Sequence, residues 1–90
     1  MAVKVKIPQF LEQFTDGKKI VEVEGSTVGE CLKDLAKKFP GAEKELFDKN
    51  GEVLYYLDIY VNDESTYPDT LSKPVQDGDE ISIVLMLSGG

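Results

Sequence analysis

Few residues in this sequence could take part in chemistry, and the two glycines at its end, Gly89 and Gly90, are the most distinctive of them. The 90 residues include no His and no Trp, a single Cys, and ten basic residues that are all Lys. Histidine is the usual general base and metal ligand of proteins, and arginine is the usual planar clamp for phosphates and carboxylates. We therefore do not expect this chain to be an enzyme, or to bind a metal ion or a cofactor itself.

The diglycine end has two interpretations. Glycine has no Cβ atom, so Gly89 and Gly90 can pass through a narrow channel in backbone conformations that other residues avoid. Residues 87–90 span at most about 13 to 14 Å when extended, which is enough to place the last carboxylate inside the active site of another protein. The alternative is a frayed end without a role. Residue types alone leave both interpretations open.

Other local patterns favour ordinary structure over a ligand site. Residues 48–52 lack the first and last ligands of a calcium loop, and residues 25–29 lack the second half of a phosphate loop, so we interpret both as turns. Cys31 lies at the margin of an apolar stripe, and no His is present to activate its thiol. We expect a small, partly buried hydrophobe there, with an exposed and unimportant thiol as the alternative.

Two strands are predicted at the start of the chain. Residues 3–7 alternate apolar side chains with lysines, which is typical of a strand with one buried face, and Pro8 ends it because proline cannot donate to a ladder. After a longer connection and the turn signal Asp16-Gly17, residues 18–24 predict a second strand. We expect these two strands to pair antiparallel.

A helix is predicted next, over residues 28–39. Thr27 and Glu30 have the spacing of a capping box, in which the threonine oxygen accepts from a backbone N–H and the glutamate reaches back to the cap. Apolar residues recur at helical spacing, and Pro40-Gly41 ends the segment. A weaker helical turn is expected over residues 42–47.

The second half of the sequence predicts two more strands and a short element between them. Residues 52–62 are rich in β-branched and aromatic side chains and predict the first of these strands. Residues 66–71 are expected to be extended or looped around Pro68. A turn at residues 77–79 then leads into the last strand, over residues 80–85.

This order of elements predicts an α+β fold, in which a mixed sheet of four to five strands packs on one main helix. The first and last strands are the most apolar, so we expect them side by side at the centre. The order is that of a β-grasp arrangement, and a split βαβ arrangement is the alternative. We assign residues 1–87 to this single domain and residues 88–90 to a flexible tail.

The charge of the chain limits its partners. Seventeen acidic residues against ten lysines give a net charge of −7. Such a charge repels nucleic acid and anionic membranes, and it favours encounter with a basic protein surface. Residues 1–6 alternate apolar and charged side chains, so they offer no hydrophobic signal region. We expect a cytoplasmic protein that is a monomer when alone, with no nucleic-acid or membrane partner.

Five segments together match the pattern of one family: residues 3–8, 26–30, 59–64, 77–81 and 88–90. In these segments, over nearly its whole length, the sequence resembles the MoaD/ThiS family of ubiquitin-like sulfur carrier proteins, and the CysO type in particular. The resemblance implies the ubiquitin-like β-grasp fold. It also implies that the chain is a co-substrate on which partner enzymes act.

The chemistry that the resemblance implies takes place at Gly90, with Gly89 beside it. An adenylating enzyme of the MoeB/ThiF type, which uses ATP and magnesium, would join AMP to the Gly90 carboxylate. A sulfur donor would then convert the acyl-adenylate to a thiocarboxylate, and a sulfur-accepting biosynthetic enzyme would receive the sulfur. Cysteine synthesis is the favoured destination. A molybdopterin synthase small subunit comes next, although the usual Pro-Pro before the end is replaced by residues 84–87.

Two other classes of function stay open. A ubiquitin-like modifier would use the same terminal glycine to form isopeptide bonds with lysines of target proteins. A plain interaction domain would do no chemistry at its end.

Strand alternation predicts a docking surface for the adenylating enzyme. The odd-numbered residues of 55–61 and of 81–85 are expected to face the core, which leaves Tyr56, Tyr60, Val84 and Met86 facing outward. Exposed apolar side chains on a sheet often mark an interface. The residues that we predict to bind the partner are Tyr60, Val84, Met86, Leu87 and Ser88.

Overall fold

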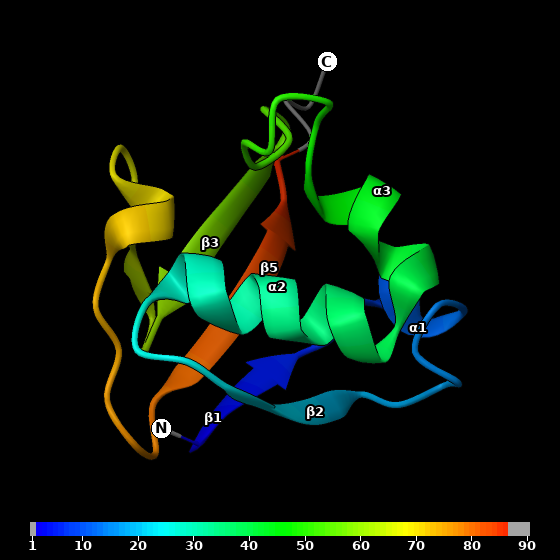
Figure 1. The fold of residues 1–90 in the computed structure, drawn as a ribbon, viewed down its shortest axis with the longest axis horizontal. Coiled ribbons are helices and arrows are strands. Elements are labelled where there is room, and N and C mark those ends of the chain that lie inside the picture. The colour runs from blue at the N-terminus through cyan, green and yellow to red at the C-terminus, as the bar shows by residue number, and fades with distance from the viewer. Residues whose placement is uncertain (1, 87–90) are drawn as a thin grey trace.

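Within residues 2–86, which the computed structural model describes, five strands form one mixed sheet (Figure 1). The strands are β1 (Ala2–Lys6), β2 (Ile20–Glu24), β3 (Leu57–Val61), β4 (Glu64–Ser65) and β5 (Glu80–Leu85). They lie in the order β2-β1-β5-β3-β4, with β1 and β5 parallel at the centre and the other neighbours antiparallel. This topology confirms the predicted β-grasp arrangement, including the central pairing of the first and last strands.

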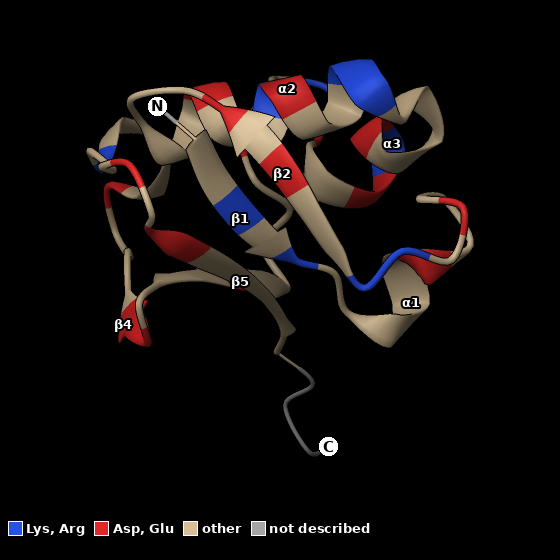
Figure 2. Ribbon diagram, turned by 90° about the horizontal axis from the view of Figure 1, so that it is seen from below, with Lys and Arg blue, Asp and Glu red and all other residues tan. Residues whose placement is uncertain are grey.

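The main helix lies across one face of this sheet (Figure 1). The helical segments are α1 (Gln9–Glu12), α2 (Val28–Lys38) and α3 (Glu43–Leu46), together with the 3-10 turns η1 (Pro40–Ala42) and η2 (Thr70–Ser72). In the view of Figure 2, α2 and α3 form a layer on one side of the strands. None of the helices in residues 2–86 is long and apolar enough to cross a membrane.

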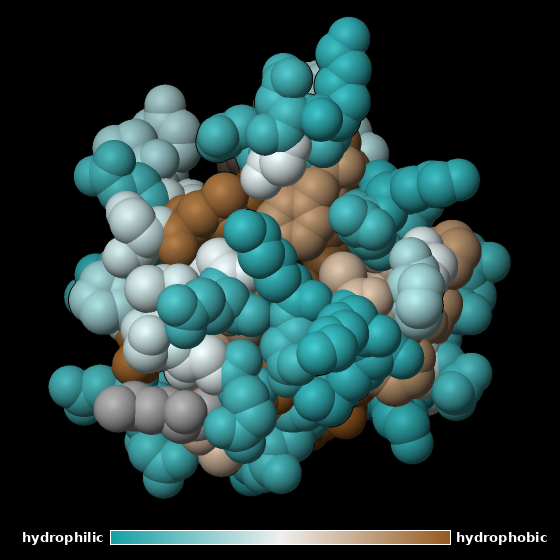
Figure 3. Space-filling view, in the orientation of Figure 1, coloured by the Kyte–Doolittle hydropathy of each residue, from teal (hydrophilic) through white to brown (hydrophobic). Residues whose placement is uncertain are grey.

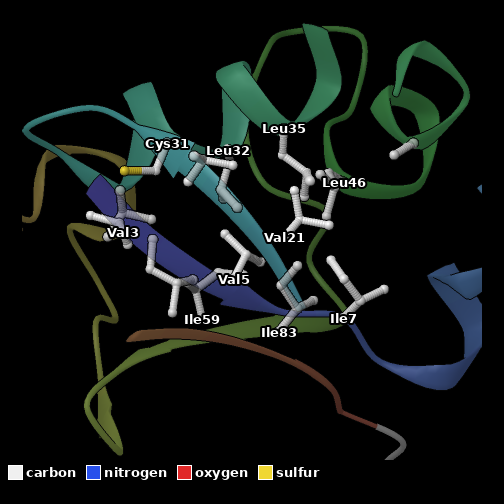
Figure 4. Close-up of a cluster of buried hydrophobic side chains, with 14 of the residues drawn as sticks. Val3, Val5, Ile7, Val21, Cys31, Leu32, Leu35, Leu46, Ile59 and Ile83 are labelled. Atoms are coloured by element: carbon white, nitrogen blue, oxygen red, sulfur yellow. The ribbon is translucent and has the colours of Figure 1, made fainter. Parts of the chain in front are cut away.

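The core lies between α2 and the inner face of the sheet (Figure 4). Val3 and Val5 of β1 are fully buried, as are Leu32 and Leu35 of α2 and Ile81 of β5. Complete burial of such a side chain contributes about 1.5 to 3 kcal/mol before the entropy cost of ordering it. Contact between the helix and the two central strands therefore contributes strongly to the stability of the fold.

The start of α2 is capped nearly as the sequence predicts. The backbone N–H of Glu30 donates to Thr27 Oγ1 over 3.1 Å, which is the predicted half of the capping box. The Glu30 carboxylate, however, accepts from the backbone N–H and the hydroxyl of Ser26, at 2.8 and 2.9 Å, one residue before the cap. These bonds, with the Ser26 N–H first, hold the pKa of Glu30 below its usual value.

The predicted strand over residues 52–62 is too long at its start, because β3 begins only at Leu57. The backbone N–H of Leu54 donates to Leu46 in α3 over 2.9 Å, and that of Leu57 donates back to Leu54 over 3.0 Å, so a turn replaces the strand there. The predicted alternation fails at Tyr55, which is 89% exposed, and at Tyr56, which packs against the core. From Leu57 onward the alternation is as predicted.

The turn at residues 48–52 is also as predicted. Asp48 Oδ1 accepts from the backbone N–H groups of Asn50 and Glu52, at 2.8 and 3.0 Å, so its carboxylate organises the turn. α1 is a feature that the sequence analysis missed. It lies in the connection between β1 and β2, and its four residues are too few for helical periodicity to show.

The glycines of the segment 25–29 allow close packing between β2 and α2 and around the start of α2. A Cβ atom on Gly25 would lie 2.9 Å from the backbone nitrogen of Cys31. One on Gly29 would lie 2.8 Å from the backbone oxygen of Leu71, in η2. Both distances are shorter than real Cβ contacts, which explains why this spacing of glycines occurs without a phosphate loop.

Replacing Gly29 by alanine tests this packing. We expect Gly29→Ala to lower the free energy of unfolding by about 1 kcal/mol, because an overpacking cost of about 1 to 3 kcal/mol exceeds a helix-propensity gain of up to about 1 kcal/mol. Urea denaturation measures the change. Lys33→Ala, at an exposed position of the same helix, is the control and should stay within about 0.5 kcal/mol of the wild type. A Gly29→Ala protein more stable than the wild type would contradict the prediction.

Candidate functional site

The residues that are predicted to react, Gly89 and Gly90, lie outside the described residues, as do Leu87 and Ser88. Met86 is the last residue that the structure describes. Its backbone N–H donates to the carbonyl oxygen of Tyr56 over 2.7 Å, so the hydrogen bonding of β5 continues one residue beyond the strand. This bond fixes where the chain leaves the sheet toward residues 87–90.

The face of the sheet opposite α2 carries two of the predicted docking residues. Tyr60 on β3 pairs with Ser82 on β5, and Val84 lies two residues farther along β5, on the same face. Val84 is 40% exposed and Tyr60 is half-buried. In Figure 2, β5 carries a charged residue only at its start, and the rest of the strand is uncharged. The predicted outward orientation of Tyr60 and Val84 is confirmed.

Tyr60 and Val84 line an open groove of about 470 Å³, which we call the sheet groove (residues 6–8, Tyr60, Asp63 and 82–84). The sequence analysis missed the contribution of Lys6 and Pro8 to this surface. Pairing of Lys6 with Ser82 between the two central strands places the end of β1 beside β5. The sequence could have indicated this contribution. The first and last strands were predicted to be neighbours, and Lys6 faces outward on the first.

Met86 does not share this groove with Tyr60 and Val84, although it is 46% exposed, as predicted. It lines a second groove of about 850 Å³, which we call the tyrosine groove (residues 52–55, 57–58, Ser65, 67–72 and Met86). The two grooves are neighbours, because Asp58 of the tyrosine groove pairs with Val84 of the sheet groove. The structure thus divides the predicted docking surface into two adjoining parts. Its role in docking stays a prediction.

Hydrogen bonds join two of the segments that carry the family resemblance, residues 59–64 and 77–81. Asn62 Nδ2 donates to Asp79 Oδ1, and the backbone N–H of Glu80 donates to Asn62 Oδ1, both over 3.0 Å. We call this pair of bonds the Asn62–Asp79 latch. It fixes the start of β5 against the end of β3, and thereby the register that places Tyr60 and Val84 on one face.

One of the two latch bonds ends on the Asp79 carboxylate, and it favours the ionised form of that group. The Asp79 carboxylate accepts from the backbone N–H of Gln76 over 2.8 Å as well as from Asn62. These two bonds, with the Gln76 N–H first, hold the pKa of Asp79 below its usual value. Asn62 also has φ of 49°, a left-handed conformation that Asn adopts more readily than most residues.

Cys31 is fully buried, so the alternative of an exposed thiol is excluded. Burial raises the pKa of its thiol to about 11, and the carboxylates of Glu30 and Asp34 add to the rise. The reactive thiolate is therefore scarce at neutral pH. Within residues 2–86, no group of three or more Cys, Asp or Glu side chains lies close enough together to hold a metal ion.

The chain is similar to known proteins over its whole length. The sequence model of the ThiS family matches residues 5–90. A curated protein of Archaeoglobus fulgidus, whose description as a sulfur carrier protein is provisional, is 30% identical over 91 residues, which cover 100% of both chains.

Solved structures agree with this match. A chain in the BexX/CysO complex of Amycolatopsis orientalis is 34% identical, with a TM-score of 0.89 over 99% of this chain and 100% of that one. The small archaeal modifier protein 1 of Haloferax volcanii is 26% identical, with a TM-score of 0.86 over 100% of both chains. These likenesses confirm the ubiquitin-like form of the β-grasp fold.

The latch predicts a pH dependence of stability. Because the folded-state pKa of Asp79 lies below the unfolded value near 3.8, its carboxylate stabilises the fold above that value, and the contribution is lost as the pH falls through the folded-state pKa. We expect Asp79→Asn to be less stable than the wild type at neutral pH, and the two stabilities to converge on acidification.

Urea denaturation at a series of pH values from neutral to strongly acidic measures both stabilities. Asn62→Gly removes one of the two donors to Asp79 and suits the left-handed backbone, so it should show part of the same effect. Two curves that stay parallel down to the lowest pH would contradict the role of the latch.

Proposed function

The chain belongs to the ThiS family, and we propose that it carries sulfur as a thiocarboxylate on the carboxyl end of Gly90. The family match carries this proposal, because it extends to Gly90 and so includes the diglycine end. The composition supports it, because a chain without His and Arg is better suited to being a co-substrate than a catalyst.

The proposed chemistry needs activation by a partner. A free carboxylate is a poor electrophile, so an adenylating enzyme first joins a Gly90 oxygen to the α-phosphorus of ATP and releases pyrophosphate. A sulfur nucleophile, sulfide in the simplest case, then attacks the carbonyl carbon, and AMP leaves with that oxygen. ATP and magnesium belong to the partner enzyme, which is of the MoeB/ThiF type on this proposal. The carrier itself supplies the reacting carbon.

The sheet groove and Met86 form the proposed docking surface for this enzyme. Val84 and Met86 are exposed apolar side chains near the end of β5, and Tyr60 lies beside Val84. When this protein docks there, residues 87–90 can reach at most about 13 to 14 Å beyond Met86. The similarity to a chain of the BexX/CysO complex supports docking of this fold on a partner protein.

We favour cysteine synthesis as the destination of the sulfur. The 34% identity to a chain of the BexX/CysO complex supports the CysO type. A molybdopterin synthase small subunit comes second, because residues 84–87 replace the Pro-Pro that is usual in that group.

A modifier is the second candidate function, and a specific observation favours it. The small archaeal modifier protein 1 of Haloferax volcanii has nearly the same fold, with a TM-score of 0.86. In this alternative a target lysine, instead of sulfide, attacks the activated Gly90 carbonyl. The intact mass of the protein from its native cells distinguishes the two: a gain that matches one oxygen replaced by sulfur indicates a carrier, and a ladder of conjugates indicates a modifier.

Deletion of Gly90 tests the reactive end. We expect the shortened protein to form no adenylate with an adenylating enzyme that activates the wild type with ATP and magnesium. Its free energy of unfolding should be unchanged, because terminal residues usually contribute little to folding. Pyrophosphate release and the intact mass measure activation. Equal turnover of the shortened protein would overturn the proposed mechanism.

Replacing Val84 by glutamate tests the docking surface. We expect Val84→Glu to weaken binding to the adenylating enzyme about tenfold or more, because it buries a charge in an apolar contact. The thermal midpoint should change little, because Val84 is already 40% exposed. Ile20→Glu makes the same change of charge at an exposed apolar residue of β2, outside both grooves, and should bind more nearly like the wild type. Equal losses in both variants would show that net charge, not the sheet groove, decides binding.

A further inference from the structure

The tyrosine groove lies where the loop before β3 faces the segment around η2. Residues 52–58 form one wall, residues 65–72 form the other, and Met86, the last described residue, also lines the groove. In Figure 3 an apolar patch is exposed at the upper left, where η2 and the loop before β3 face each other in Figure 1. The sequence analysis did not find this surface, because it placed residues 52–56 in a strand.

The groove presents the two most exposed aromatic side chains of the described residues. Tyr55 is 89% exposed and Tyr67 is 80% exposed, and Met86 is 46% exposed. Tyrosines are enriched among the side chains that contribute most to protein interfaces, because they offer a large apolar ring with a polar tip. Two tyrosines and Met86 around one groove therefore make a surface suited to contact with an apolar side chain of a partner.

Hydrogen bonds hold both walls in place. Thr66 is buried, and its backbone N–H and its hydroxyl both donate to the carbonyl oxygen of Ile59, at 2.9 and 2.7 Å. Tyr67 directly follows this anchor. The ring of Tyr55 packs edge-on against that of Tyr56, with centroids 5.3 Å apart, and Tyr56 packs against the core. The ring of Tyr55 and the backbone next to Tyr67 are therefore held in place before a ligand binds, which lowers the cost of ordering the groove.

The charged residues that line the tyrosine groove are all acidic. Glu52, Asp58 and Asp69 line it, and among its described lining residues none is a lysine. The ion pairs found within residues 2–86 join Lys19 to Glu12 and Lys38 to Asp34, so they leave these three carboxylates without a cationic partner. The charge of the sheet groove differs, because one lysine, Lys6, and one aspartate, Asp63, line it.

This charge decides between the candidate occupants. A second copy of the chain also has a net charge of −7 and would be repelled, as would nucleic acid or an anionic membrane. A basic protein segment would gain from the unpaired carboxylates, and its apolar side chains would cover the exposed rings.

We propose that the tyrosine groove docks a basic peptide segment of a partner protein. An apolar side chain of the segment contacts Tyr55, Tyr67 and Met86, and flanking Lys or Arg side chains meet the carboxylates of Glu52, Asp58 and Asp69. A partner bound in this way lies beside the point where residues 87–90 begin. The inference goes beyond the proposed function, and it holds equally for a sulfur carrier and for a modifier.

Nuclear magnetic resonance of the full-length ¹⁵N-labelled protein tests the proposal with two synthetic peptides. The probe is acetyl-Lys-Leu-Lys-Phe-Lys-amide, and its acidic counterpart has Glu in place of each Lys. We expect the basic peptide to cause saturable shift changes that are largest in residues 52–58 and 65–72, and the acidic peptide to cause none. Raising the salt concentration from about 0.02 to about 0.3 M should weaken binding severalfold.

Variants locate the binding within the groove. Tyr67→Ala should weaken binding of the basic peptide about tenfold. Tyr55→Ala is a second variant on the other wall, with the same expected loss, in case Tyr67→Ala does not fold. The matched control is Ile20→Ala, because Ile20 is 55% exposed on β2, outside the groove, and should bind as the wild type does.

Three results would overturn the proposal. The first is the absence of saturable shifts up to millimolar peptide. The second is a set of shifts spread over all acidic surfaces, with equal losses for Ile20→Ala and Tyr67→Ala, which would indicate attraction by net charge alone. The third is a change of the groove signals with protein concentration in the absence of peptide, which would make a second copy the occupant.

Discussion

The parallel pairing of β1 with β5 is the constraint on which the rest of the structure depends. Two parallel neighbours need a long connection, so everything between residues 6 and 80 must leave the centre of the sheet and return to it. α2 makes this crossing and covers the apolar sides of both strands, where Val5 and Ile81 meet Leu35 in one core. The opposite face stays uncovered by α2. The core thus determines which face of β5 is free, and where the chain leaves the sheet after it.

The resemblance segments around Asn62 and Asp79 now have a physical explanation. They lie at the start of β5, and Met86 follows the other end of that strand. Their side chains bond to each other and fix the register of β5 against β3. A shift by one residue would turn Val84 inward and Ile83 outward. On our proposal, these hydrogen bonds serve the reaction indirectly, because they orient the strand that leads to Gly90.

Much of the fold was predictable from the sequence, and the errors have physical causes. α2 and β5 were correct because a capped amphipathic helix and an alternating strand each bury one face, and this periodicity shows in the residues. β3 was predicted to start five residues early because Val53, Tyr55 and Tyr56 have high strand propensity. The backbone bonds from Leu54 to Leu46 in α3 and from Leu57 back to Leu54 form a turn there instead. Such bonds depend on tertiary contacts that no local pattern contains. The outward positions of Tyr60 and Val84 followed from alternation alone, but the tyrosine groove depends on that unpredicted turn.

The two grooves suggest how one small protein can serve more than one partner. On our proposals, the reacting carbonyl is activated by one enzyme and consumed by another, and both must reach the same few residues after Met86. A single docking surface would make the partners compete for every contact. Here the sheet groove and the tyrosine groove meet at the pair Asp58 and Val84 and differ in charge, since one lysine and one aspartate line the first and three carboxylates without a lysine line the second. Different charge lets each groove select its own partner by electrostatic complementarity. Their shared border keeps either partner within reach of the end of the chain.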